Sequence, residues 1–272
     1  MAKKTVKLIN LTDDFDQLLT IWRTCFPEDA DFGETFLRQV APNTEIVGVF
    51  ENDILASCAY FIPASFVDGK TRFKAYYVYG VGTLPLYRGK GYARDVLEFA
   101  KQSLLCDLLF LYPAKPSLRM FYEKMGYRSV LYRKVQALSP SKADAVCAIK
   151  TTPFSVTDYV KKRTAFLLDK NTAYATFDDT VFQTLLEHAE ILSFGNGTAL
   201  CVTDGDTMYL TEVLCDKLPL LSTEQYPLLK NVLAYEAGTE QESGMVLPCT
   251  KCAIKHFNQK EKVPFFGTFF AE

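Results

Sequence analysis

One stretch of the sequence decides the fold: Val81-Gly82-Thr83-Leu84-Pro85-Leu86-Tyr87-Arg88-Gly89-Lys90-Gly91-Tyr92-Ala93. The stretch predicts the end of a strand, a glycine-rich loop and the start of a helix. A helix N-terminus offers unpaired N–H groups and the positive end of a dipole, and glycine permits unusual backbone angles. Arg88 and Lys90 add positive charge. These features indicate a site for a phosphate-bearing ligand.

A plainer interpretation also fits this stretch, namely a glycine-rich turn flanked by two surface cations. Two better-known phosphate motifs are excluded. The Walker A pattern Gly-x-x-x-x-Gly-Lys-Ser/Thr does not occur, and neither does the dinucleotide fingerprint Gly-x-Gly-x-x-Gly. A second motif is therefore needed to decide what the loop binds.

Hydrophobic periodicity on both sides of the stretch predicts a mixed α/β plan for residues 1–137. The expected helices cover residues 12–25, 31–40, 91–104 and 116–126. The expected strands cover residues 45–50, 54–62, 72–84, 108–112 and 127–137. This order combines antiparallel strands with one β–α–β crossover, so we expect a central mixed, twisted sheet flanked by helices.

The rest of the chain repeats the order in a shorter form. Residues 138–150 are the best candidate for a linker, and residues 151–272 form a second, smaller α/β domain. Its expected helices are 155–169, 178–189 and 223–236. Its expected strands are 190–195, 198–203, 207–214, 244–248 and 263–270. The repeated order hints at a duplicated fold, although the sequences of the two halves share little.

The second motif lies one predicted strand after the glycine loop and reads Phe121-Tyr122-Glu123-Lys124-Met125-Gly126-Tyr127. The two stretches together resemble the GNAT superfamily of N-acetyltransferases. That family's pattern Arg/Gln-x-x-Gly-x-Gly/Ala is matched by Arg88, Gly91 and Ala93. The resemblance implies the GNAT fold and acetyl-CoA as co-substrate.

The resemblance also implies roles for individual residues. Backbone groups of Val81, Gly82 and Thr83 would pair with the pantetheine arm. The pyrophosphate would accept N–H groups from the loop and helix start, formed by Arg88, Gly89, Lys90, Gly91, Tyr92 and Ala93. Lys115 occupies a position where the family often has an asparagine that contacts the CoA arm, so here it would meet a CoA phosphate instead.

Tyr122 matches the family tyrosine that lies near the CoA sulfur. Its implied role is that of a general acid, which protonates the departing thiolate. The alternative is that Tyr122 only packs between a helix and the sheet. Glu28, Asp29 and Asp31 lie in a region that the family commonly uses for the acceptor, although a solvated loop would look the same. No general base is evident.

An active first unit followed by a degenerate second one resembles the enhanced-intracellular-survival branch of the superfamily. No Arg/Gln-x-x-Gly-x-Gly occurs after residue 150. We therefore expect residues 151–272 to be a degenerate GNAT-like or acceptor-shaping domain that binds no CoA.

Composition limits the remaining functions. The chain has 272 residues, of which 49% are hydrophobic and 23% charged, and its net charge is −2. No basic face for nucleic acid is implied, and no run reaches the roughly 18 apolar residues of a membrane span. The N-terminus lacks the apolar segment of a secretory signal. We expect a cytoplasmic protein, and a homo-oligomer is compatible with the sequence.

Metal chemistry is not expected. Cys249, Cys252 and His256 have the spacing of a partial zinc motif, but a structural zinc site needs four ligands and no second pair accompanies these three. The eight cysteines lie mostly in apolar runs and predict small buried side chains rather than disulfides.

The sequence therefore predicts an acetyl-CoA-dependent N-acetyltransferase that acts on a primary amine of a small molecule by direct attack on the thioester. Two alternatives stay open. One is a non-catalytic acyl-CoA sensor, and the other is an acyltransferase for proteins or for longer acyl chains. Acceptor pockets are built from variable loops, so the sequence does not name the acceptor.

Overall fold

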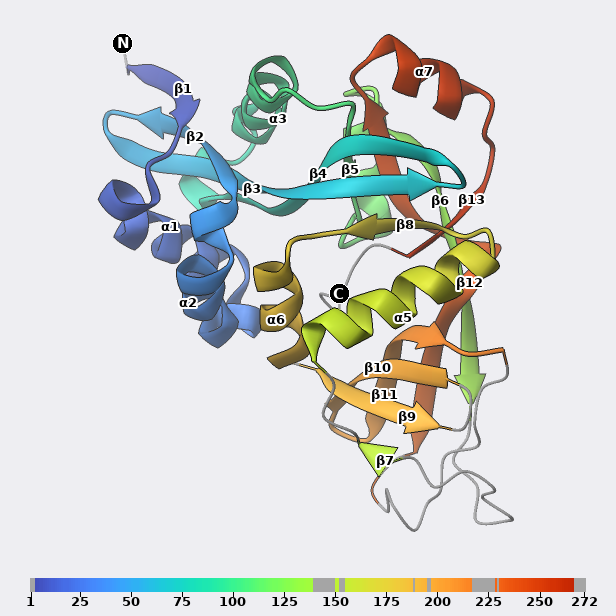
Figure 1. Cartoon of the computed structure of the whole chain (residues 1–272). Coiled ribbons are helices and arrows are strands. Elements are labelled where there is room, and N and C mark those ends of the chain that lie inside the picture. Colours follow the sequence, from blue (N-terminus) through green and yellow to red (C-terminus); the bar gives the residue numbers. More distant parts are fainter. Residues whose placement is uncertain are drawn as a thin grey trace. The chain divides into compact units, whose positions relative to one another are not determined.

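The computed structural model describes residues 3–138, 150–151, 155–187, 189–194, 197–216, 228 and 230–266. The fold is mixed α/β, as predicted (Figure 1). The chain forms two compact units. Unit 1 contains Met1–Ser65, Phe73–Ser129 and Gly244–Lys260, and unit 2 contains Phe66–Arg72, Val130–Ser243 and Glu261–Glu272. The linker predicted at 138–150 falls almost entirely outside the described residues, and the predicted domain bounds stay a prediction.

Unit 1 carries most of the elements of the first half of the chain, together with α7 from the second half. Its strands are β1 (Lys4–Leu8), β2 (Glu45–Glu51), β3 (Ile54–Asp68), β4 (Thr71–Thr83) and β5 (Leu108–Leu111). Its α-helices are α1 (Leu11–Cys25), α2 (Ala30–Gln39), α3 (Tyr92–Ser103), α4 (Arg119–Glu123) and α7 (Lys251–Asn258). Short 3-10 turns cover Pro27–Asp29, Ala41–Asn43, Pro85–Tyr87 and Pro116–Leu118.

The sheet of unit 1 has the strand order β1-β2-β3-β4-β5-β12, where β12 is Asn231–Pro248. β1 and β2 are antiparallel, as are β2 and β3. β4 and β5 are parallel, which requires the crossover through α3. Only the end of β12 lies in this unit, where Met245–Pro248 pairs antiparallel with β5.

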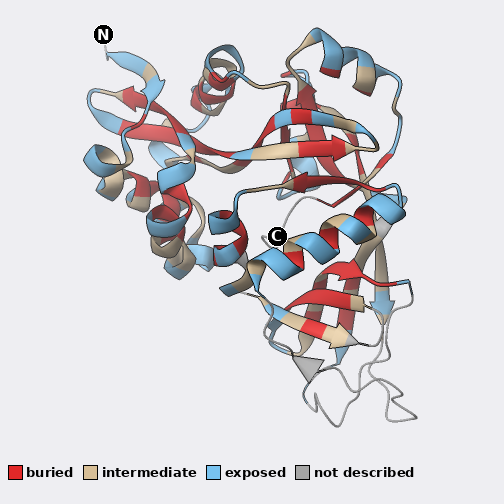
Figure 2. Ribbon diagram, in the orientation of Figure 1, coloured by how far each residue is buried: buried red, intermediate tan, exposed pale blue. Residues whose placement is uncertain are grey.

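Alternation along these strands sends neighbouring side chains to opposite faces of the sheet. Tyr60 and Tyr79 pack against Trp22 of α1 and Phe36 of α2. Residues one position away, such as Val78, join a second cluster with the apolar side of α3 and with Tyr122 of α4. Both faces are therefore covered, and most of β2, β3 and β5 is buried (Figure 2).

Unit 2 holds most of the second half of the chain. Its strands are β6 (Arg128–Leu138), β7 (Lys150–Thr151), β8 (Ala173–Thr176), β9 (Glu190–Phe194), β10 (Gly197–Asp204), β11 (Thr207–Leu214), the first part of β12, and β13 (Val263–Phe266). Its helices are α5 (Val156–Asp169) and α6 (Asp179–Glu187). The strand order is β8-β13-β6-β12-β11-β10-β9-β7.

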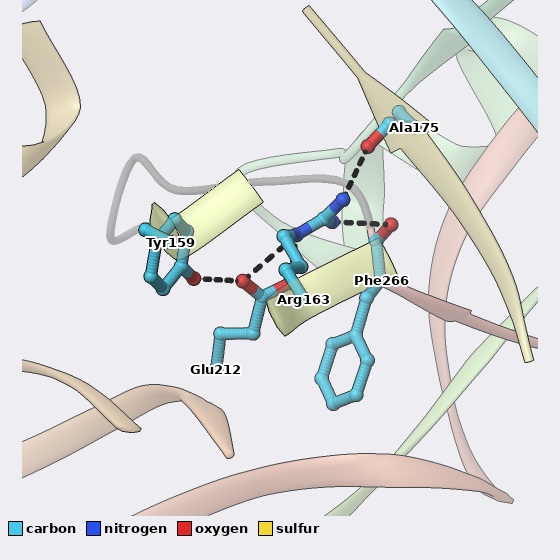
Figure 3. A network of polar contacts seen from close by, with 5 residues as sticks. All are labelled: Tyr159, Arg163, Ala175, Glu212 and Phe266. Carbon is cyan, nitrogen blue, oxygen red and sulfur yellow. Dashed lines mark hydrogen bonds and ion pairs between the residues drawn. The ribbon is translucent and has the colours of Figure 1, made fainter. Parts of the chain in front are cut away.

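A charged network lies in the core of unit 2 (Figure 3). Arg163 on α5 and Glu212 on β11 are each 1% exposed, and Arg163 Nε lies 2.9 Å from both carboxylate oxygens. Arg163 also donates to the carbonyls of Ala175 (2.8 Å) and Phe266 (3.3 Å), while Tyr159 donates to Glu212. Every nitrogen of the guanidinium group thus has a partner, which is the condition under which a buried charge is tolerated.

The structure corrects one predicted element. The helix expected at 223–236 is wrong for its last six residues, because Asn231 begins β12 and pairs with Thr207 of β11. Most of the earlier part of that helix lies outside the described residues. A short apolar run such as Val232–Ala234 fits a strand as well as a helix, and here the available partner strand decides. Strands β1 and β8 and helix α7 were not predicted.

Candidate functional site

The parallel pair of β4 and β5 opens after three rungs. Ala75–Tyr77 pairs with Leu108–Phe110, after which β5 ends while β4 continues to Thr83. Gly80 has a φ of +58° at the start of the unpaired section, and a Cβ there would lie 2.8 Å from the ring of Tyr60. The second half of β4 therefore presents an edge that β5 leaves unpaired, and such an edge can pair with an extended ligand.

Some backbone groups near the end of β4 already take part in hydrogen bonds within the protein. The fully buried Ser57 of β3 donates to the carbonyl of Gly82 at 2.8 Å, and Leu84 N–H also donates to β3. By alternation, Val81 faces the opposite edge, where β5 has ended. The carbonyl of Thr83 accepts from Arg88 Nε at 3.1 Å. Of the three residues predicted to hold the pantetheine arm, Gly82 and Thr83 therefore have carbonyls that already accept a hydrogen bond from the protein.

Gly82 has a packing role that the sequence did not indicate. A Cβ at this position would lie 2.8 Å from the side chain of Ile21 in α1 and 3.4 Å from the sulfur of Cys25. A glycine here allows helix α1 to approach the strand closely.

The glycine loop adopts the backbone that its sequence predicts. Arg88 is extended, with a φ of −65° and a ψ of 151°, while Gly89 and Gly91 have φ values of +79° and +84°. No atom lies within 4 Å of a Cβ built on either glycine. Their requirement for glycine is therefore one of backbone angle, and the space above both is open to a ligand.

Helix α3 begins directly at this loop without a side-chain cap. Its N-cap is Gly91, and the first i to i−4 hydrogen bond of the helix runs from Asp95 N–H to Gly91 O at 3.0 Å. Within the described ranges, the N–H groups of Tyr92, Ala93 and Arg94 have no protein acceptor. Three aligned donors at the positive end of a helix dipole are an arrangement that favours the binding of an anion.

The two cations of the loop are placed differently. Lys90 forms an ion pair with Glu51 at the end of β2, with an Nζ–Oε1 distance of 3.3 Å. Glu51 also accepts the hydroxyl hydrogen of the buried Tyr92. Arg88 is exposed and pairs with no carboxylate of the described chain. The charge of Lys90 is thus partly offset by a carboxylate of the protein, whereas the charge of Arg88 faces no carboxylate of the described chain.

The same bonds shift the pKa values of Glu51 and Tyr92. The hydrogen bond from Tyr92 lowers the pKa of Glu51, and Lys90 lowers it further. The acceptance of that bond by Glu51 raises the pKa of Tyr92 to about 12. The side chain of Tyr92 therefore belongs to this anchor, and only its backbone N–H is directed to the anion site.

Tyr122 lies on α4, on the same face of the sheet as α3. Its ring is buried against Phe121 and Tyr127, with centroid distances of 5.1 and 5.6 Å. Among the described residues its hydroxyl has no hydrogen-bond partner, and this oxygen is not fully enclosed by protein atoms. Burial raises the pKa of Tyr122 to about 12, which keeps the phenol protonated at neutral pH.

The remaining predicted residues lie at the surface. Lys115 is exposed in the connection from β5 to α4, and its backbone carbonyl caps the short turn that follows. Glu28 and Asp29 are exposed in the turn between α1 and α2, and Asp31 is exposed in the first turn of α2. Trp22 Nε1 donates to the carbonyl of Asp29 at 3.0 Å. Partial burial, with a contribution from Glu28, raises the pKa of the Asp29 carboxyl.

Cys252 and His256 of the partial zinc motif lie on α7, and Cys249 lies two residues before that helix. His256 packs edge-on against Phe73 at 5.1 Å. In the described part of the chain, no three acidic, histidine or cysteine side chains are grouped closely enough to hold a metal ion. The helices described there are also too short or too polar to cross a membrane.

These features were compared with known proteins. The sequence profile of the acetyltransferase (GNAT) domain matches residues 5–130. Residues 5–130 form a GNAT acetyltransferase domain. The comparison with curated protein sequences finds no match. The GNAT domain contains both motifs from which the resemblance was drawn.

Solved structures show that the fold likeness extends beyond the GNAT domain. A GCN5-related N-acetyltransferase from Kribbella flavida superposes with a TM-score of 0.69 at 16% identity, over 90% of this chain and 71% of that one. A probable N-acyltransferase from Enterococcus faecalis V583 gives 0.70 at 13%, over 93% and 74%. Eis1 from Mycobacterium abscessus gives 0.59 at 10%, over 91% and 74%. The shared fold therefore includes unit 2.

Proposed function

We propose that this protein is an acetyl-CoA-dependent N-acetyltransferase that acetylates a primary amine of a small molecule. One observation carries the proposal: after the glycine loop, the unpaired edge of β4 is followed by three N–H groups at the start of α3 that have no acceptor among the described residues. An extended arm that ends in a pyrophosphate matches this order of an open strand edge followed by an anion site.

In the proposed reaction the amine nitrogen attacks the thioester carbonyl carbon. Negative charge develops on the carbonyl oxygen, and backbone N–H groups of the open edge of β4 near Val81 would stabilise it. Collapse of the tetrahedral intermediate breaks the C–S bond. The Tyr122 hydroxyl donates its proton to the leaving thiolate, so the products are an amide and free CoA thiol.

The amine has to reach the thioester without its extra proton. Asp29 and its acidic neighbours between α1 and α2 would attract a cationic amine to that side of the domain. Unit 2 repeats the order of an antiparallel hairpin followed by a short parallel pair, in β9 to β12. This order supports the proposal that unit 2 is a degenerate GNAT-like repeat.

Thiol release from acetyl-, propionyl- and longer acyl-CoAs against a panel of small amines and peptides tests the proposal. We expect the highest kcat/KM with acetyl-CoA and a small primary amine. Unchanged CoA binding without turnover on any acceptor would instead identify a sensor. A preference for peptides or for long acyl chains would favour the other alternative.

CoA binding itself is tested by the double variant Arg88→Glu, Gly91→Glu, which places two negative charges at the anion site. We expect at least a hundredfold weaker CoA binding by calorimetry. The matched control is Gly205→Glu in the β10–β11 turn, a glycine that also has a positive φ (+57°) and open space around it. CoA binding that survives the double variant would refute the assignment of the site.

A further inference from the structure

Two half-buried cysteines of unit 1, Cys106 and Cys249, form a pair of thiols that the acyl-transfer site does not use. Cys106 precedes β5 and Cys249 follows β12. Pro248 of β12 pairs with Leu108 of β5, so the two cysteines lie on adjoining rungs just beyond the last pair. Both cysteine side chains pack against the same hydrophobic cluster, which contains Leu104, Leu109 and Leu247.

The backbone around the pair is held in place by Asp107. Its carbonyl accepts the N–H of Cys249 at 2.7 Å, and its carboxylate accepts the Thr250 hydroxyl at 3.0 Å. The same carboxylate accepts the N–H of Lys74 at 2.9 Å, which joins the start of β4 to this point. The backbone that carries the two cysteines is therefore held in place by bonds that do not involve the thiols themselves.

The environment makes the two thiols unequal. The S–H of Cys106, the positive charge of Lys101 and the N–H of Leu109 all stabilise a thiolate on Cys249 and lower its pKa against the opposing effect of burial. The bond to Cys249 and burial raise the pKa of Cys106. Nucleophilic attack requires a thiolate, so Cys249 suits the attacking role and Cys106 the resolving role.

We propose that Cys106 and Cys249 are a redox-active dithiol that a hydroperoxide oxidises to an intramolecular disulfide. The Cys249 thiolate attacks the terminal oxygen of the hydroperoxide, an S–O bond forms, the O–O bond breaks, and the alcohol leaves after taking a proton. Cys106 then attacks the resulting sulfenic acid, an S–S bond forms, and water leaves with the thiol proton. Two thiols lose two electrons, and the hydroperoxide becomes alcohol and water.

The cross-link would connect the start of β5 to the junction of β12 and α7. These segments lie far apart in the sequence, so the disulfide closes a long loop and restricts the unfolded chain. The thermal stability of unit 1 would therefore depend on the redox state of the two cysteines. The backbone of the acyl-transfer site would hardly change.

The test uses the full, reduced chain treated with hydrogen peroxide and then with an alkylating agent. We expect the thiol count to fall by two from the eight of the sequence, a Cys106–Cys249 cross-linked peptide by mass spectrometry, and an unfolding midpoint several degrees higher. Reduction with dithiothreitol should reverse all three changes.

Variants separate this pair from its neighbour Cys252, which is exposed on α7. Cys252→Ser should form the disulfide like the parent chain. Cys249→Ser should consume peroxide at least tenfold more slowly, and Cys106→Ser should accumulate a sulfenic acid that dimedone traps. A Cys249–Cys252 cross-link, or overoxidation of Cys249 in the parent chain without any disulfide, would overturn the proposal.

Discussion

Units 1 and 2 both contain a short parallel pair of strands beside an antiparallel hairpin. They differ in the residues that follow the strand at the unpaired end of that pair. In unit 1, β4 passes its last rung with β5 and leads into Gly89, Gly91 and the uncapped start of α3. In unit 2, β11 passes its last rung with β12 and ends beside a cavity of about 430 Å³.

That cavity is lined by charges that already have partners. Lys170 pairs with Asp216 at 2.5 Å, and Lys134 pairs with Glu236 at 2.9 Å. Residues 215–230 also contain no glycine. The same strand arrangement thus leaves free backbone donors in one unit and neutralised side chains in the other. Strand topology therefore leaves the end of one strand unpaired in both units, whereas the residues after that strand decide whether the unpaired end can bind an anion.

The core of unit 2 contains a buried ion pair, whereas the core of unit 1 contains aromatic rings. We expect the greatest loss of stability when that ion pair is broken. Arg163→Ala should lower the free energy of unfolding by about 3–5 kcal/mol, because Glu212 is left buried without its cation. Urea denaturation measures the loss. Replacing both partners by Met and Leu should recover most of it. The matched control Lys230→Ala breaks an exposed pair with Asp206 and should leave the midpoint nearly unchanged.

The next effect tests the chemistry proposed for unit 1. Tyr122→Phe should lower kcat about a hundredfold, since a general acid typically contributes at least that much, while the Kd for CoA stays the same. The control is Tyr127→Phe, which removes a hydroxyl that is enclosed without a partner, and it should keep full activity. An equal loss in both variants would assign Tyr122 to packing alone.

The dependence of kcat on pH is a second test of Tyr122 as the general acid. Burial raises the pKa of Tyr122 to about 12, so the proton-donating form persists below that value and is lost only as the pH rises through it. We therefore expect kcat to rise as the amine loses its proton and to show no alkaline decline up to about pH 10. A decline centred near pH 8 would require another acid.

Local elements of the site could be predicted from the sequence because their signals are contiguous. The helix expected at 91–104 is Tyr92–Ser103, and the strand expected at 72–84 is Thr71–Thr83. Glycine at two positions of positive φ is a local requirement that can be inferred without knowledge of distant residues.

The contacts that support the site were not predictable in the same way. Ser57 reaches Gly82 across the β3–β4 pairing, and Glu51 reaches Tyr92 across 41 positions of sequence. Neither partner carries a motif of its own. The division of β12 between two units was missed for a similar reason, because each part of that strand is decided by the partner it meets.

A smaller effect is expected at Gly91. It tests whether the glycine loop of unit 1 needs a positive φ at this position in order to bind CoA. Gly91→Ala should cost about 1–2 kcal/mol of stability, since a φ of +84° is unfavourable for a residue with a Cβ. It should also weaken CoA binding about tenfold, which corresponds to about 1.4 kcal/mol. Gly205→Ala in unit 2 carries the same strain and should leave CoA binding unchanged. Calorimetry and urea denaturation on both variants separate the two costs.

The smallest effect concerns the anchor behind the loop. Glu51→Ala removes the acceptor for Tyr92 and the partner of Lys90, so the start of α3 loses two side-chain bonds to β2. Two consequences oppose each other: the anion site becomes less ordered, but Lys90 becomes free to meet a phosphate. Because exposed ion pairs contribute little, we expect CoA binding to weaken by only about threefold.

The control Asp95→Ala breaks the Lys4–Asp95 pair on the same helix and leaves the contacts of Glu51 intact, and CoA binding should not weaken. Salt dependence distinguishes the two consequences in Glu51→Ala. A freed Lys90 would make CoA binding more sensitive to ionic strength than in the parent chain. Tighter binding at low salt would mean that Glu51 restrains Lys90 more than it orders the loop, and the anion site of unit 1 would then depend on side-chain charge as well as on backbone donors.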